Sequence, residues 1–218
     1  MRRFSYAIFD MDGTLVDSMP YWRSLHVTYA REYKPSLTEE EATYLAGVWG
    51  TRHILDALAG IGLATTKEEL FSYYEKKMAF YYAERIREKP EAVAHLDRLK
   101  EAGVRMGVIT MTPHVGAEFC LENTGLSHYF SFVLTPEDTP RGTGKEDPHI
   151  FRLALSFLGC KNPADCAFYE DSLYAMRTAR QMGFYIRAVE ERFGEQERKE
   201  VCQVADEILT FGYNPIVL

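Results

Sequence analysis

Short apolar runs alternate with longer helical patterns along most of this 218-residue chain, and this alternation constrains the fold more than any other feature. The mostly apolar runs lie at 4–9, 104–109, 130–134, 166–169 and 184–188. Runs of this length are typical of parallel strands that are covered on both faces. The helical patterns lie at 90–102, 114–124, 148–158 and 172–182. Together they predict an α/β fold, with a doubly wound, Rossmann-like parallel sheet.

One section, residues 18–86, breaks this alternation and shows no strand pattern. Two capping boxes mark helix starts inside it, because Thr38 is followed three residues later by Glu41 and Thr66 by Glu69. A glycine pair at 60 and 62 indicates a turn between helices. The section therefore predicts an all-helical insertion between the first strand and the rest of the sheet.

The composition is that of an acidic, folded protein, with 46% hydrophobic and 26% charged residues. A net charge of −7 disfavours a nucleic-acid partner, because an acidic surface repels the phosphate backbone. No apolar run reaches the ~18 residues of a membrane span, and the run at 4–9 is shorter than a signal-peptide core. The four cysteines form no C-x-x-C pair, so reduced thiols are expected. We expect a cytoplasmic monomer or homodimer without a membrane partner.

The string D-M-D-G-T-L-V-D-S, residues 10–18, directly follows the first predicted strand. In open α/β sheets, ligands bind at this edge. Asp10 and Asp12 can share one site if the chain turns between them, which Gly13 permits. One carboxylate can attack phosphorus, and the other can protonate the leaving group and later deprotonate water. A magnesium ion would offset the accumulated negative charge.

This string resembles the first motif of the haloacid dehalogenase superfamily. It is most similar to the branch that contains β-phosphoglucomutase and phosphoglycolate-type phosphatases. That branch carries a helical cap after the first strand. The resemblance implies a core domain of residues 1–16 and 87–218 and a cap domain of residues 17–86.

The resemblance also implies roles for the first motif. Asp10 is expected to be the nucleophile and a Mg²⁺ ligand. Asp12 is expected to be the general acid and base, with its backbone carbonyl as a second ligand. Thr14 would help to hold the loop.

Two further motifs are expected to hold the phosphoryl group. Thr110 ends the second predicted strand, where the family places a hydroxyl donor and backbone N–H groups. Met111 follows it, where relatives often have a small or polar residue, so only its backbone contact is expected. Lys145 keeps the family spacing to Pro148, although Glu146 replaces a common proline. Its ammonium group would neutralise the nucleophile and the phosphoryl group.

The last motif follows the run at 166–169. By the resemblance, Asp171 is the stronger metal ligand and Glu170 binds directly or through water. A carboxylate pair that opens a helix can also serve only as a cap. Ala175 stands where relatives often have Gly or Asp.

The cap segment 46–52 resembles a specificity loop, so Gly47 and Arg52 are candidate substrate-binding residues. Arg52 could hold a second phosphate or carboxylate, or be ordinary cap surface. Asp12 argues against a dehalogenase, which lacks the second Asp of this pair, and against a phosphonate hydrolase, which usually lacks it. We expect a Mg²⁺-dependent phosphatase that acts on a small phosphorylated metabolite. A sugar-phosphate mutase and a non-catalytic phospho-ligand sensor remain alternatives.

Overall fold

The computed structural model describes residues 4–48, 51–191 and 198–215, without the side chains of residues 51 and 52. The chain divides into two compact units. An α/β unit comprises the residues up to Asp17 together with Ile86–Pro215. A helical unit comprises Ser18–Arg85.

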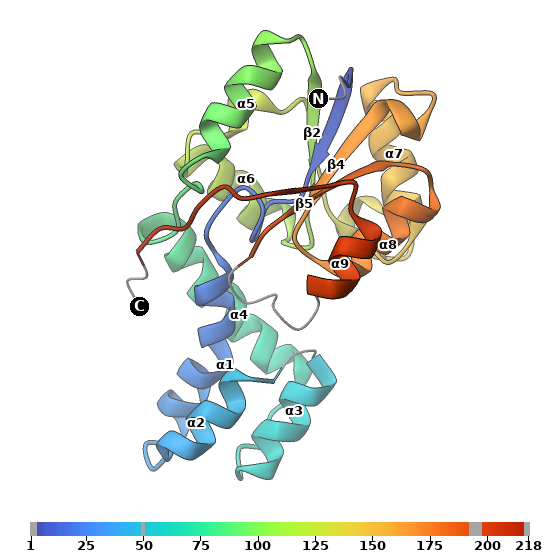
Figure 1. The fold of residues 1–218 in the computed structure, drawn as a ribbon. Coiled ribbons are helices and arrows are strands. Elements are labelled where there is room, and N and C mark those ends of the chain that lie inside the picture. The colour runs from blue at the N-terminus through green and yellow to red at the C-terminus, as the bar shows by residue number, and fades with distance from the viewer. Residues whose placement is uncertain (1–3, 49–50, 192–197, 216–218) are drawn as a thin grey trace. The chain divides into compact units, whose positions relative to one another are not determined.

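The α/β unit contains a parallel sheet with the strand order β3-β2-β1-β4-β5-β6 (Figure 1). The strands are β1 (Tyr6–Phe9), β2 (Arg105–Ile109), β3 (Val133–Leu134), β4 (Cys166–Glu170), β5 (Tyr185–Val189) and β6 (Glu207–Leu209). This order is that of a doubly wound sheet, and it confirms the predicted α/β class. The central strands are almost wholly buried, as their apolar runs predicted.

Helices connect the strands and cover the sheet. They are α5 (Ala92–Glu101), α6 (His114–Asn123), α7 (Pro148–Leu158), α8 (Leu173–Gln181) and α9 (Arg198–Val204). Short 3₁₀ turns lie at Ser127–Tyr129, Pro136–Asp138 and Pro163–Asp165. Figure 1 shows α5 and α6 on one side of the sheet and α7 and α8 on the other.

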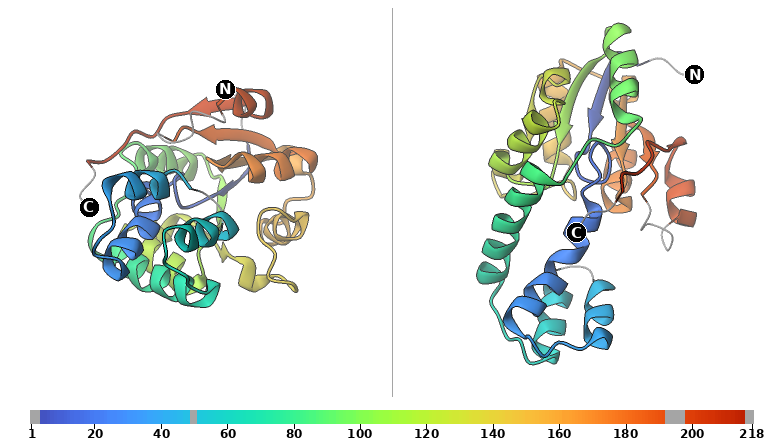
Figure 2. Two further views of the ribbon diagram at one scale, coloured as in Figure 1. Left: turned by 90° about the horizontal axis from the view of Figure 1, so that it is seen from below. Right: turned by 90° about the vertical axis from the view of Figure 1, so that its left-hand side faces the viewer.

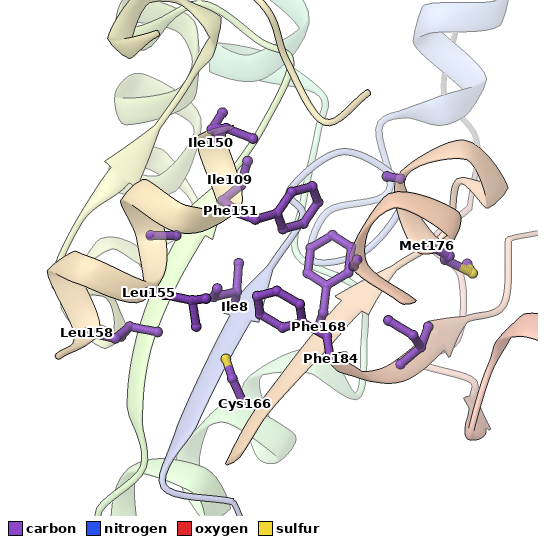
Figure 3. Packing of buried hydrophobic residues seen from close by; sticks show 14 of the residues in the cluster. Ile8, Ile109, Ile150, Phe151, Leu155, Leu158, Cys166, Phe168, Met176 and Phe184 are labelled. Carbon is purple, nitrogen blue, oxygen red and sulfur yellow. The ribbon is translucent and has the colours of Figure 1, made fainter. Parts of the chain in front are cut away.

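The main core lies between the sheet and helices α7 and α8 (Figure 3). Phe151 of α7 packs edge-on against Phe168 of β4, with ring centroids 5.1 Å apart. Ile8 of β1 and Ile109 of β2 belong to the same core. Burial of these apolar side chains holds β1, β2 and β4 in one register, which places their carboxyl ends together.

The helical unit consists of α1 (Met19–Tyr33), α2 (Glu39–Ala46), α3 (Thr51–Gly60) and α4 (Lys67–Glu84) (Figure 2). Both capping boxes form, because Thr38 accepts from the Glu41 amide and Thr66 accepts from the Glu69 amide, each at 3.2 Å. Aromatic rings fill much of this unit's interior. They include Tyr21, Tyr29, Tyr73, Tyr74 and Tyr82.

The two segments that lead into and out of the helical unit pair with each other inside the α/β unit. The Asp17 amide donates to the Arg87 carbonyl at 3.0 Å, and the Lys89 amide donates to the Leu15 carbonyl at 2.8 Å. An antiparallel bridge joins Val16 to residue 88. Both ends of the helical insertion are therefore anchored next to the loop that follows β1.

Within the described ranges, no helix combines the length and the apolar character needed to cross a membrane.

Candidate active site

Three acidic side chains meet at the edge where the central strands end. Asp10 directly follows β1, Glu170 is the last residue of β4, and Asp171 comes next. Phe9 lies opposite Tyr169 in the parallel register, so the residues that follow them are neighbours. One carboxylate oxygen from each acidic residue lies within 4.8 Å of the other two. Carboxylates this close repel one another strongly unless a cation offsets their charge.

The loop after β1 turns sharply, as two neighbouring carboxylates require. The Met11 carbonyl accepts hydrogen bonds from the amides of Thr14 at 3.3 Å, Leu15 at 2.9 Å and Val16 at 3.1 Å. Gly13 adopts a φ of 85°, a left-handed conformation that is costly for residues with a Cβ. The chain therefore leaves its extended conformation immediately after the strand, at the glycine that the motif supplies.

The two carboxylate oxygens of Asp10 differ in their surroundings: one is hydrogen-bonded to Lys145, and the other has no partner among the described residues. The residue is 3% exposed, and its Oδ1 accepts from Lys145 Nζ at 2.6 Å. The Asp10 amide donates to the Tyr169 carbonyl at 2.9 Å, which fixes the backbone. Oδ2 is buried and hydrogen-bonds to none of the described residues. A buried carboxylate oxygen without a partner is costly, and this one is available to a cation or an electrophile.

Lys145, in the loop that precedes α7, forms ion pairs with two of the three acidic residues, Asp10 and Glu170. It is 2% exposed, and its ammonium group donates to Asp10 and also to Glu170 Oε2 at 2.7 Å. Asp147 caps α7 by accepting from the His149 amide at 2.8 Å, which sets where the loop ends. Burial acts to lower the pKa of Lys145, but the two carboxylates raise it well above its ordinary value. Lys145 is therefore charged at neutral pH.

Glu170 is engaged on both oxygens. Its Oε1 accepts from the amides of Asp171 at 3.2 Å and Ser172 at 3.0 Å, and its Oε2 accepts from Lys145. The side chain is fully buried. Glu170 thus orients Lys145 and the start of α8. Asp171 is half-buried and has a long contact, 3.5 Å, from Thr14 Oγ1.

The electrostatic environment favours protons or cations on these carboxyls. Burial, and then the charge of Glu170, raise the pKa of Asp10 to about 7, although Lys145 opposes the shift. Burial and the charges of Glu170 and Asp10 raise the pKa of Asp171 well above its ordinary value. Lys145 alone does not compensate three carboxylates. The cluster therefore fits a divalent cation, which hard oxygen ligands of this kind would hold.

Asp12 is linked to the loop that follows β2. Its half-buried carboxylate accepts a hydrogen bond at Oδ2 from Thr112 Oγ1, at 2.7 Å. Thr112 was not among the residues that the sequence motifs indicated. A threonine two residues past a strand carries no distinctive signal, and this bond depends on how two loops 100 residues apart meet.

Thr110 and Met111 lie at the end of β2. The Thr110 hydroxyl oxygen accepts from the Thr112 amide at 3.1 Å, so its hydrogen can point toward an acceptor such as a phosphoryl oxygen. Met111 is 45% exposed, and its thioether lies against Gly144. A Cβ at Gly144 would come within 2.2 Å of the Met111 sulfur, so a side chain there requires Met111 to move.

Gly47 and Arg52 belong to the helical unit, whereas Glu146 and Ala175 lie in the α/β unit. Gly47 caps the end of α2, and its amide donates to the Tyr44 carbonyl at 3.1 Å. The Arg52 side chain falls outside the described residues. Ala175 is fully buried in the core, so its small size suits its place. Glu146 is exposed, and its carboxylate accepts from the Gly144 amide at 3.0 Å.

The chain resembles known proteins over most of its length. A family model for haloacid dehalogenase-like hydrolases matches residues 4–183. The pyrophosphatase PpaX of Bacillus velezensis is 27% identical over 84% of this chain and 81% of that protein. A phosphoglycolate phosphatase of Agrobacterium fabrum is 33% identical over 61% of this chain and 58% of that protein. A solved structure of a candidate β-phosphoglucomutase from Thermotoga maritima has the same fold, with a TM-score of 0.77 and 23% identity over 95% of this chain and 94% of that chain.

Proposed function

The chain belongs to the haloacid dehalogenase-like hydrolases, as its first motif predicted, and we propose that it hydrolyses a small phosphomonoester through an aspartyl-phosphate on Asp10. One observation carries the proposal. Asp10 presents one buried carboxylate oxygen that no described residue occupies, while Lys145 holds the other. A nucleophilic carboxylate needs this arrangement, because the attacking oxygen must be desolvated and aimed while the other stays fixed.

The residues around Asp10 supply the other functions of the reaction. Asp10 Oδ2 attacks phosphorus, the bond from phosphorus to the leaving oxygen breaks, and Asp12 gives its proton to that oxygen. Asp12 then takes a proton from water, which attacks the same phosphorus. The bond between phosphorus and Asp10 breaks, and inorganic phosphate and a free Asp10 carboxylate result. Thr110 and Lys145 would hold the phosphoryl oxygens, with the backbone at Met111 as a further donor.

We propose Mg²⁺ as the cation of this site. Asp10 and Asp171 would bind it through their carboxylates and Asp12 through its backbone carbonyl. Glu170, whose oxygens already accept three hydrogen bonds, would act through a water. The bound ion would neutralise the negative charge that gathers on the phosphoryl group and on the carboxylates.

The substrate class rests on the relatives and on the helical unit. A phosphoglycolate phosphatase and a pyrophosphatase are among the curated relatives, which supports a small phosphorylated metabolite as substrate. We propose that the helical unit is a cap that selects this substrate. Gly47 and Arg52 stay candidate contacts within it.

Phosphate release tests the activity directly. Phosphorylated sugars, nucleotides and small acids should be assayed with Mg²⁺ and with chelator. We expect Mg²⁺-dependent release from one or a few of them. Asp10→Asn should reduce turnover by at least about 10³-fold while the protein still folds. The control variant Asp165→Asn makes the same substitution at an exposed aspartate and should not reduce turnover. Release that survives in Asp10→Asn would contradict the proposal.

Beryllium trifluoride tests the nucleophile independently of any substrate. Because it mimics a phosphoryl group bound to a carboxylate, it should form an adduct with Asp10 when Mg²⁺ is present. A structure determined under these conditions with no density at Asp10 would count against the assignment. An adduct without phosphate release from any substrate would instead point to a mutase or a sensor.

A further inference from the structure

A side-chain hydrogen bond from Thr112 to Asp12 joins the loop after β2 to the loop after β1. The donor is the Thr112 hydroxyl, the acceptor is Asp12 Oδ2, and the distance is 2.7 Å. Thr112 is 5% exposed, so water competes little for its hydroxyl. The distance is that of a strong hydrogen bond to a carboxylate.

Thr112 is itself held in place. Its amide donates to Thr110 Oγ1 at 3.1 Å, and the Thr110 amide donates to the Leu134 carbonyl at 2.9 Å. The donor to Asp12 is therefore tied, through the turn at 110–112, to the rigid end of β2. Its position relative to Asp10 is set by the pairing of β1 with β2.

The Asp12 side chain needs such a partner to keep one orientation. Hydrogen bonds to the Met11 carbonyl fold the backbone of this loop, whereas the Thr112 hydroxyl acts on the Asp12 side chain itself. Asp12 is half-buried. A bond to Oδ2 stops the carboxyl group from rotating. It also favours Oδ1 as the site of a proton carried by Asp12, because the carbonyl oxygen of a carboxylic acid accepts the Thr112 hydrogen better than its hydroxyl oxygen does.

We propose that Thr112 is a positioning residue that aims Oδ1 of Asp12 at the leaving-group oxygen. The inference rests on the proposed function, because it assumes that Asp12 is the general acid. Thr112 touches neither the phosphoryl group nor the leaving group in this role. It acts only by limiting the orientations of Asp12.

Two substrates of nearly equal size separate this role from a general structural one. The leaving group of phenyl phosphate is a weak acid and needs protonation, whereas that of para-nitrophenyl phosphate is a much stronger acid and leaves without it. The ratio kcat/KM covers the steps up to release of the phenol. A fault in acid catalysis therefore lowers kcat/KM for phenyl phosphate selectively.

Thr112→Val keeps the shape and the backbone N–H but removes the hydroxyl. It should lower kcat/KM for phenyl phosphate by roughly 10- to 100-fold and that for para-nitrophenyl phosphate by less than about 3-fold. Thr112→Ser restores the hydroxyl and should recover most of the loss. Thr124→Val removes a hydrogen bond from the hydroxyl to the Cys120 carbonyl at the C-terminal end of α6. This control variant should leave kcat/KM unchanged for both substrates.

Asp12→Asn separates the inference from the function on which it rests. It should show the same selectivity with a larger loss. One outcome is that Asp12→Asn lowers kcat/KM selectively for phenyl phosphate while Thr112→Val lowers kcat/KM equally for both substrates, or for neither. In that case Thr112 does not position the acid and the inference is wrong. If Asp12→Asn itself shows no selectivity, Asp12 is not the acid, and both the assigned role and the inference are overturned. Thermal melting of each variant confirms that it is folded.

Discussion

Lys145 is the residue on which the charge balance of the site depends. It lies buried between Asp10 and Glu170, and both carboxylates take part of their compensation from it. Removing one partner of a buried ion pair leaves an uncompensated charge, which is far costlier than losing a surface pair. Stability and activity at this position are therefore linked.

Lys145→Met should abolish turnover and destabilise the metal-free protein by about 3 kcal/mol or more at neutral pH. Without the ammonium group, the folded-state pKa values of Asp10 and Asp171 rise further above their unfolded values, because the charge of Lys145 lowers both. Protonation then relieves the repulsion, so the variant should regain stability relative to wild type as pH falls from about 8 to about 6. Chemical denaturation in chelator measures this. Lys161→Met, at an exposed lysine, should show no such pH dependence.

His95 is a second buried titratable residue, away from the proposed chemistry. Its Nε2 lies 2.9 Å from the Tyr169 hydroxyl, which also accepts from Arg187. Burial first, and then the nearby charges of Arg187 and Arg98, lower the pKa of His95 to about 4 from 6.5. The imidazole is therefore neutral in the folded protein at neutral pH.

Acid should destabilise the fold partly through His95. Because its folded pKa is lowered, the unfolded chain takes up a proton first, and stability is lost as pH falls from about 6.5 toward 4. The loss should reach about 2 kcal/mol between pH 7 and pH 5. His95→Gln cannot titrate, so the difference in unfolding free energy between wild type and variant should shrink or reverse over this range. A constant difference would show that His95 does not titrate on unfolding.

At the scale of elements, local sequence signals account for most starts and ends. Helix α7 runs over the predicted 148–158, with Asp147 as its cap. The exceptions are the edge strands and α9, which was not predicted. β3 is only Val133–Leu134, although the run at 130–134 predicted more, and β6 was not predicted. β6 has only three residues, pairs with β5 at the edge of the sheet, and is half-buried or exposed. Because its residues are not fully buried, no apolar run marks it in the sequence.

The capping box of α4 offers a test at this scale. Thr66→Ala should destabilise the helical unit by about 1 kcal/mol, because the Glu69 amide loses its acceptor. Thr66→Ser should cost much less, since it keeps the hydroxyl. Denaturation followed by helical circular dichroism compares the two. An equal loss for both variants would assign the effect to the methyl group rather than to the cap.

At the scale of the whole molecule, the chain builds two units with separate cores. The proposed ligands of the cation all belong to the α/β unit, whereas Gly47 and Arg52, the proposed substrate contacts, belong to the helical unit. Binding of the cation should therefore depend on the α/β unit alone. Selection of the substrate should depend on the helical unit.

Calorimetric titration with Mg²⁺ tests this division. Leu70→Ala removes a fully buried side chain of α4 and should destabilise the helical unit by about 3 kcal/mol. Its Mg²⁺ affinity should stay within about 2-fold of wild type. Asp171→Asn should lower the Mg²⁺ affinity by about 10-fold or more. A large loss in Leu70→Ala, with retention in Asp171→Asn, would contradict the division and the proposed ligands.

The sequence by itself determined the elements that local physics decides. Apolar runs long enough to be buried on both faces set the central strands, and proline, glycine and capping boxes set the helices. The D-x-D-G-T string, through its resemblance to a known superfamily, also indicated the family, because the turn at Gly13 and the paired carboxylates are adjacent in the chain.

Only the tertiary structure decided the contacts between distant segments. The bonds from Lys145 to Asp10 and Glu170 span 135 and 25 residues, and the bond from Thr112 to Asp12 spans 100. Contacts between residues so far apart in the sequence depend on strand order and loop packing, which no local sequence pattern encodes. The open Oδ2 of Asp10 likewise became visible only once its surroundings were assembled. Burial of the sheet core brings these loops to one edge, and the chemistry of the site follows from that.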